Sequence, residues 1–204
     1  MLFRSAIWLA PAWAAGASPG DAHALIAVNG ASRINLYYRS STGGNPDKWA
    51  LRRTDGTHDV TAMSATQTHA AGSLVCLVGG GDATSLSLSV NGGTYATAAD
   101  ANNTPVLGTI LDIASNGGAS HLDGAVIAVA LLDRVPTQAE ATALATLNRP
   151  PLLGERVGPA MIGLWYGAQR IAWALPSTGT AIDLNDTDAG DLDRKSTRLN
   201  SSHI

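Results

Sequence analysis

Short segments in which apolar and polar residues alternate constrain the fold of this chain more than any other feature. In residues 85–90, Leu86, Leu88 and Val90 alternate with three serines. Successive side chains of a β-strand point to opposite faces, so this pattern is typical of a strand with one buried face. The pattern predicts that the three apolar side chains face a core and that the serines face outward.

The same alternation recurs along the first two thirds of the chain and predicts many short strands. Asn-Gly and Asp-Gly pairs, which favour the positive φ angles of tight hairpin turns, occur at residues 29–30, 55–56 and 91–92. A continuous apolar run at residues 74–78 is typical of a strand buried on both faces, with Cys76 packing as a small apolar side chain. We therefore expect antiparallel sheets. The expected strands lie near residues 6–11, 22–28, 33–39, 48–54, 57–63, 73–78, 85–90, 94–97, 109–114 and 122–132.

The period of the pattern changes once, at residues 136–147. Thr137 and Glu140 have the spacing of a capping box, in which each side chain bonds the backbone amide of the other residue. This spacing predicts one short helix, with Leu144 and Leu147 on its buried face.

The sequence changes character again near residue 148, where we expect a domain boundary. Residues 161–166 and 169–175 have the pattern of one more hairpin around Gly167. Residues 177–191 are polar and acidic, and they are typical of a linker. A calcium-binding loop is disfavoured there, because Asp188 stands at the sixth position counted from Asp183, where glycine is needed. No glutamate follows at the twelfth position.

The two ends of the chain resemble translated sequencing adapter. Residues 193–203 resemble one reading frame of a common short-read adapter, and the opening MLFRS resembles the opposite adapter end. The alternative for residues 193–203 is a coincidental basic tail. The expected limits are residues 1–5 and 193–204 for the adapter-derived ends, 6–148 for one β domain of a fragment, and 149–192 for a linker with the extra hairpin.

Composition excludes several classes of protein. The net charge is −3, and nine basic and 15 acidic residues remain without the two ends, which is the opposite of a nucleic-acid-binding footprint. No run of about 20 apolar residues is present, so we expect no helix that spans a membrane. The single cysteine, Cys76, cannot form an internal disulfide.

Several of these stretches, in their order and spacing, resemble the concanavalin A-like lectin/glucanase superfamily in its laminin-G-like and pentraxin-like branch. The stretch LSLSVNG at residues 86–92 resembles a strand and hairpin of that branch, and HLDG at residues 121–124 resembles the entry to a later strand. Arg134, Thr137 and Glu140 resemble its closing strand and short helix. The opening WLAPAW at residues 8–13 resembles an early strand of the family.

The resemblance implies a jelly-roll β-sandwich, here without its usual first strand. It also implies a module that binds a glycan or a surface protein, often with calcium. Such modules occur in larger extracellular, cell-surface, cell-adhesion or phage tail proteins, so the resemblance implies one of those locations.

Glycosidases of this superfamily need two carboxylates on one strand, which act as nucleophile and acid/base. Glu140 and Glu155 are the only glutamates, and neither lies in an expected strand. We therefore expect no enzymatic activity. The motif GASPG at residues 16–20 matches a hydrolase pattern, but a turn is expected because a strand, not a helix, follows it.

The candidate ligand site lies on the strand at residues 33–39. Asn35, Tyr37 and Arg39 alternate with core-facing residues, and the next strand adds Lys48 and Arg52. An aromatic ring flanked by such donors can stack on a sugar or hold a carboxylate. An ordinary solvated sheet face is the alternative. Trp8, Trp13 and Trp49 are expected in the core.

For a metal, the hypothesis is a calcium ion bound at the rim of the sandwich, with Asp112, Asn116 and Asp123 as its ligands. The alternative for Asp123 is turn chemistry before the last strand. The histidines have no metal-ligand spacing. Two functions follow: a non-catalytic lectin-like binding module, or a structural or protein-interaction β-sandwich without a sugar site.

Overall fold

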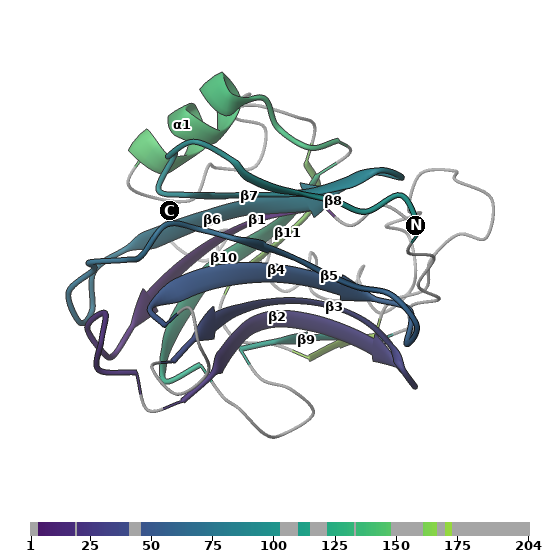
Figure 1. Cartoon of the computed structure of the whole chain (residues 1–204). Coiled ribbons are helices and arrows are strands. Elements are labelled where there is room, and N and C mark those ends of the chain that lie inside the picture. The colour runs from purple at the N-terminus through teal and green to yellow at the C-terminus, as the bar shows by residue number, and fades with distance from the viewer. Residues whose placement is uncertain are drawn as a thin grey trace, which may run out of the picture. The chain divides into compact units, whose positions relative to one another are not determined.

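The protein folds into two six-stranded antiparallel sheets packed face to face, with one helix on the outer side of the first sheet (Figure 1). This arrangement, in a computed structural model, confirms the predicted antiparallel β-sandwich with a short helix. The structure describes residues 4–18, 20–40, 46–102, 110–114, 122–132, 134–147, 161–166 and 170–172, which belong to one compact unit, Met1–Ala174.

The first sheet has the order β11-β10-β1-β6-β7-β8. Its strands are β1 (Arg4–Pro11), β6 (Val75–Gly81), β7 (Ser85–Val90), β8 (Ala96–Ala99), β10 (Gly124–Leu132) and β11 (Met161–Tyr166). β1 lies between β6 and β10, which are far from it in the sequence, so long-range pairing holds this sheet together.

The second sheet has the order β12-β9-β2-β3-β4-β5. Its strands are β2 (Ala22–Asn29), β3 (Ser32–Arg39), β4 (Lys48–Thr54), β5 (Asp59–Met63), β9 (Ile110–Ile113) and β12 (Arg170–Ala172). β2 to β5 form a meander of consecutive hairpins, as the turn signals predicted.

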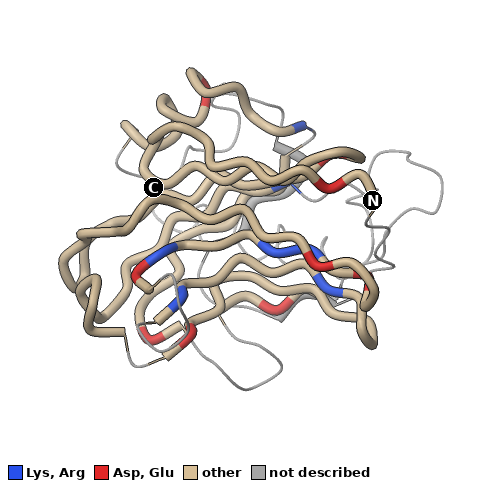
Figure 2. Tube along the Cα trace, viewed as in Figure 1, with Lys and Arg blue, Asp and Glu red and all other residues tan. Residues whose placement is uncertain are grey.

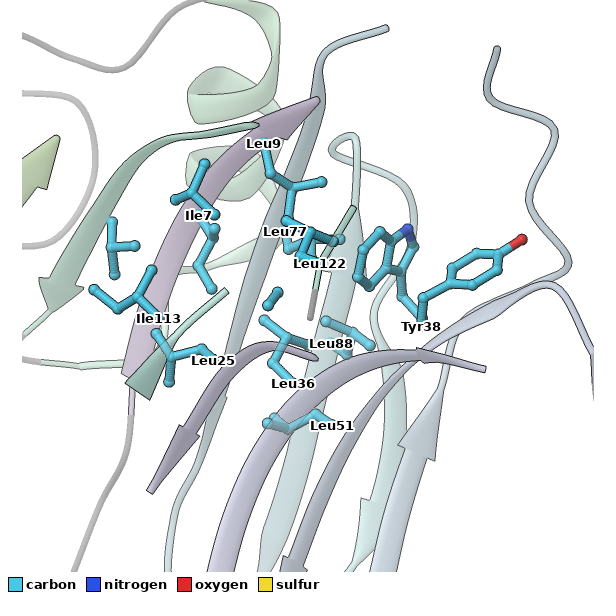
Figure 3. Close-up of a cluster of buried hydrophobic side chains, with 14 of the residues drawn as sticks. Ile7, Leu9, Leu25, Leu36, Tyr38, Leu51, Leu77, Leu88, Ile113 and Leu122 are labelled. Atoms are coloured by element: carbon cyan, nitrogen blue, oxygen red, sulfur yellow. The ribbon is translucent and has the colours of Figure 1, made fainter. Parts of the chain in front are cut away.

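The main core lies between the two sheets and is built from alternate residues of each strand. Leu36 and Leu51 of the second sheet share one buried cluster with Leu77 and Leu88 of the first sheet (Figure 3). Leu86 belongs to the same cluster and is fully buried. The alternation in β7 therefore predicted the core-facing residues of this strand correctly.

Trp8, Trp13 and Trp49 are core residues, as expected. Trp13 and Trp49 lie in the cluster between the sheets, whereas Trp8 lies on the other side of the first sheet. Trp13 also packs against Tyr38, with their ring centroids 4.4 Å apart.

A second apolar layer lies between the first sheet and helix α1 (Gln138–Thr146). Cys76 and Val78 of β6 face Ala141 and Leu144 of the helix, while the odd-numbered residues of β6 face the other sheet. β6 is thus buried on both faces, as its apolar run predicted. Burial raises the pKa of the Cys76 thiol to about 12, so the thiol stays protonated.

The predicted capping box begins the helix. The Glu140 amide donates to Thr137 Oγ1 at 3.3 Å, and the Thr137 amide donates to Glu140 Oε2 at 2.8 Å. The buried face differs slightly from the prediction, because Leu147 is only half-buried at the C-cap and Ala141 takes its place beside Leu144. In the described ranges, no helix is long and apolar enough to cross a membrane.

The turn at Asn91 and Gly92 holds the helix onto the first sheet. Both residues have positive φ angles, of 51° and 73°. The Gly92 carbonyl accepts hydrogen bonds from Gln138 Nε2 at 2.9 Å and from Thr142 Oγ1 at 3.0 Å. This turn is therefore both the end of a hairpin and the docking point of α1.

The expectation of one extra hairpin beyond residue 148 is wrong. β11 and β12 are present near the predicted positions, but β11 pairs with β10 of the first sheet and β12 pairs with β9 of the second. They therefore extend two different sheets and do not form the expected hairpin. β1 already begins at Arg4. The adapter-derived ends and the domain limits at residues 148 and 192 stay predictions.

One buried ion pair links the two sheets. The guanidinium of Arg53, on the core-facing side of β4, pairs with the Asp100 carboxylate just after β8, and their side chains are only 3% and 1% exposed. Arg53 Nη1 also donates to the Asp82 carbonyl at 2.8 Å. These contacts provide partners for the Arg53 guanidinium, which the alternation in β4 places between the two sheets.

We expect Arg53→Met to lower the free energy of unfolding by about 3–5 kcal/mol, because it leaves the Asp100 carboxylate buried without its partner. Arg52→Met is the matched control, since it removes a partly exposed pair with Asp59 that contributes about 1 kcal/mol or less. Urea unfolding measures both variants. Equal losses would show that the buried pair does not hold the sheets together.

We expect Gly92→Ala to destabilise the fold more than Gly30→Ala. Both glycines have positive φ, which costs alanine about 1–2 kcal/mol. A Cβ on Gly92 would lie 2.8 Å from the Thr142 Cα, whereas nothing lies within 4 Å of one on Gly30. Thermal unfolding of the two variants compares them. Similar midpoints would contradict tight docking of the helix on this turn.

Candidate functional site

The candidate site is the outer face of the second sheet, meaning the side turned away from the first sheet. In β3, Ile34, Leu36 and Tyr38 belong to the core between the sheets. The intervening residues Asn35 and Tyr37 are absent from that core, because successive side chains of a strand point to opposite faces. The structure thus places Asn35, Tyr37 and Arg39 on one face, as the alternation predicted.

The register of β3 and β4 brings the other two predicted residues to the same face. Arg39 is opposite Lys48, and Asn35 is opposite Arg52. Directly opposite residues in an antiparallel pair have neighbouring side chains. All five predicted ligand residues are therefore gathered on the outer face.

The centre of the outer face is buried, which an ordinary solvated sheet face would not be. Asn35 and Tyr37 are 3% and 8% exposed, and Ile26 and Ala50 beside them are also buried. We call these four residues the floor. The strands β2, β3 and β4 bow toward the first sheet, so the floor lies on the inside of a curve (Figure 1).

A half-buried rim surrounds the floor. Arg39, Lys48 and Arg52 belong to it, together with Arg33 at the other end of β3. Four of the eight described Lys and Arg residues lie on this rim, and Figure 2 shows blue segments gathered on the second sheet. The protein is acidic overall, so this local basic charge distinguishes the rim from the rest of the described surface.

Acidic side chains offset part of the basic charge. Arg52 Nε donates to both carboxylate oxygens of Asp59, at 2.8 and 3.1 Å. This contact lowers the pKa of Asp59, so the pair stays ionised in the neutral range. Arg52 is thus held in place by Asp59, while Arg39 lies against the sulfur of Met63.

His23 is a part of the outer face that the sequence analysis missed. Its ring stacks on Tyr37 with centroids 5.4 Å apart and an interplanar angle of 22°. A bulge in β2 between His23 and Leu25 puts His23 opposite Tyr37. Burial lowers the pKa of His23, which favours the neutral imidazole. The bulge interrupts the alternation, so the sequence pattern gave no signal for this contact.

The structure does not show the three predicted calcium ligands together in one site. Asp112 lies in β9 of the second sheet, Asp123 immediately precedes β10 of the first sheet, and Asn116 is outside the described residues. Among the residues that the structure describes, no three His, Cys, Asp or Glu side chains are grouped to hold a metal. The calcium site of Asp112, Asn116 and Asp123 therefore stays a prediction.

Two other candidates from the sequence have structural roles. Glu140 accepts hydrogen bonds from Arg134 at 2.6 and 2.7 Å, and this contact is the main reason that its pKa falls to about 2. Ser18, in the hydrolase-like motif, lies in the loop between β1 and β2 and donates to the Gly20 carbonyl. Neither residue is arranged as a catalytic group, while Glu155 and His121 lie outside the described residues.

Known structures with a similar fold include two from unrelated organisms. The CBM40 module of the IT-sialidase of Ruminococcus gnavus, bound to α2,6-sialyllactose, is 17% identical, with a TM-score of 0.51 over 71% of this chain and 84% of that one. The heptameric SAP-like pentraxin of Limulus polyphemus is 11% identical, with a TM-score of 0.49 over 82% of each chain. No curated protein sequence matches this chain.

The sequence itself carries the family assignment. The Laminin_G_3 sequence profile, described as the concanavalin A-like lectin/glucanases superfamily, matches residues 6–142. This range covers most of both sheets and the start of helix α1. The chain therefore belongs to the concanavalin A-like lectin/glucanases superfamily.

Proposed function

We propose that this chain is a non-catalytic, lectin-like module that binds a carbohydrate on the outer face of the second sheet. The observation that carries the proposal is the buried floor with its half-buried basic rim, built from Asn35, Tyr37, Arg39, Lys48 and Arg52. As such modules are commonly parts of larger proteins, we further propose that it acts within an extracellular, cell-surface or phage tail-type protein.

The chemistry of the outer face suits a sugar. The half-buried ring of His23, which is supported by the buried Tyr37 beneath it, provides surface for the apolar side of a sugar ring. The guanidinium of Arg39 and the ammonium of Lys48 donate hydrogen bonds to hydroxyl or carboxylate oxygens. A few fixed polar groups beside apolar surface are typical of small-ligand sites.

The state of Glu140 supports the non-catalytic part of the proposal. Glycoside hydrolysis needs a carboxylic acid with a raised pKa beside a second carboxylate. Glu140 has a lowered pKa and is engaged by Arg134 and the helix N-terminus. Such a group is ionised at neutral pH and cannot serve as the general acid.

A second candidate function is a structural or protein-interaction sandwich without a sugar site. The half-buried basic rim also favours it, because Arg33, Arg39 and Lys48 can pair with acidic groups of a protein partner.

The binding test is a glycan array probed with the purified protein, followed by the double variant Tyr37→Ala/Arg39→Ala. We expect the wild type to bind at least one glycan. We expect the double variant to lose that binding by about 100-fold or more, because it removes the ring that supports His23 and a charged donor.

Thr97→Ala is the matched control, since Thr97 is exposed on β8 of the other sheet. Circular dichroism establishes that each variant is folded. Unchanged affinity of the folded double variant would refute the assignment to the outer face. Failure of the wild type to bind any glycan, with or without calcium, would favour the protein-interaction sandwich.

The calcium hypothesis has a separate test. If calcium holds the rim as predicted for Asp112, Asn116 and Asp123, we expect EDTA to reduce glycan binding and added calcium to restore it. Titration of the metal-free protein with calcium in a calorimeter measures the site directly. Binding that is equal in EDTA and in calcium, with no heat of calcium binding, would remove calcium from the proposal.

A further inference from the structure

A loop of residues 64–74 connects β5 of the second sheet with β6 of the first, and we call it the crossover loop. Around its middle, Thr68, Ala70 and Ala71 are exposed, whereas His69 is half-buried. His69 is therefore the side chain that anchors this part of the loop to the sandwich. A segment with so little buried surface opens locally at a lower free-energy cost than the strands do.

The ring of His69 packs against aromatic side chains at one end of the core. Its centroid lies 5.0 Å from that of Trp13 and 5.6 Å from that of Tyr38, with interplanar angles of 61° and 80°. Trp13 and Tyr38 are both buried. The Ala15 amide also donates to the His69 carbonyl at 2.9 Å. His69 thus holds the crossover loop to the segment after β1 by its side chain and by its backbone.

Both ring nitrogens of His69 are buried, and neither has a hydrogen-bond partner among the residues that the structure describes. A neutral imidazole has one donor and one acceptor nitrogen, whereas an imidazolium has two donors and a positive charge. A buried charged donor without an acceptor costs more free energy than a buried neutral one. The closed position of the ring therefore suits the neutral imidazole, while the imidazolium is favoured where the ring reaches water.

Asp47, just before β4, is the charged group whose field reaches the His69 ring, but burial has the larger effect and lowers the pKa of His69. Asp47 Oδ1 already accepts hydrogen bonds from the Gly16 amide at 3.0 Å and from the Tyr38 hydroxyl at 3.2 Å. Tyr38 also touches the ring, and burial raises its pKa to about 12, so this phenol stays neutral. The crossover loop and residues 11–18 contain no Asp, Glu, Lys or Arg.

We infer that His69 is a pH-sensitive anchor of the crossover loop, which holds the loop closed while its imidazole is neutral and releases it when the imidazole is protonated. In the closed loop the pKa of His69 lies below its ordinary value of 6.5, so opening takes up a proton. The closed loop therefore has its full stability above pH 6.5 and loses stability as the pH falls through 6.5 toward the lowered pKa. This inference goes beyond the proposed function and does not rest on it.

Hydrogen exchange of the full chain, followed by NMR, measures the opening of the loop. The reporting amides are those of Ala15 and Gln67, because their hydrogen bonds to the carbonyls of His69 and Asp47 join the loop to neighbouring segments. Between about pH 7.5 and about pH 5, after correction for intrinsic exchange rates, we expect their protection to fall about tenfold or more relative to amides of β6. We expect no such fall in His69→Phe, which keeps a ring and cannot be protonated.

His58→Gln is the matched control, because the His58 side chain is 46% exposed in the turn between β4 and β5. This control removes an imidazole elsewhere and is expected to keep the fall of the wild type. If His69→Phe does not fold, His69→Leu takes its place. A fall in the wild type and in His58→Gln, but not in the His69 variant, supports the inference.

Three results would overturn the inference, and two of them need no variant. Equal protection of the wild type at both pH values would show that protonation does not release the loop. Greater protection at the lower pH would show that the rings of Trp13 and Tyr38 stabilise the imidazolium by cation–π contacts. The same fall in the His69 variant as in the wild type would assign the response to another group, such as Asp47. None of these results bears on glycan binding by the outer face.

Discussion

Burial of alternate side chains between the two sheets is the constraint on which the rest of the structure depends. Each strand of β2 to β5 gives one side to that core, so its remaining side chains must lie on the outer face. A slip of one residue in β3 would exchange Leu36 for Tyr37 and bury the site in the core. Core packing and the position of the candidate site are therefore set by the same register.

Much of this arrangement could be predicted from the sequence because it is local. β4 and β7 lie at the predicted residues, and the capping box of α1 involves the two predicted side chains. The predicted position of Asn35, Tyr37 and Arg39 on one face of β3 follows from alternation alone. Turns such as Asn91-Gly92 are also local, since the residues themselves favour positive φ.

Features that depend on distant segments could not be predicted in this way. The strands β11 and β12 are close in sequence but join different sheets, and alternation does not say which neighbour a strand chooses. Asn35 and Tyr37 are buried beside side chains of the neighbouring strands, such as Ile26 and Ala50, and the alternation within β3 does not reveal those neighbours. The stack of His23 on Tyr37 depends on a bulge that breaks the pattern used to predict strands.

The bulge in β2 lets one strand carry an extra residue while both of its halves stay in phase with β3. In a regular ladder that kept Ala24, His23 would face the interior and Ala22 would face outward. Because the extra residue is absorbed at the bulge, Ala22 keeps its place in the core while the His23 ring lies beside Tyr37. A single added residue thus changes which side chain reaches the outer face without disturbing the packing between the sheets.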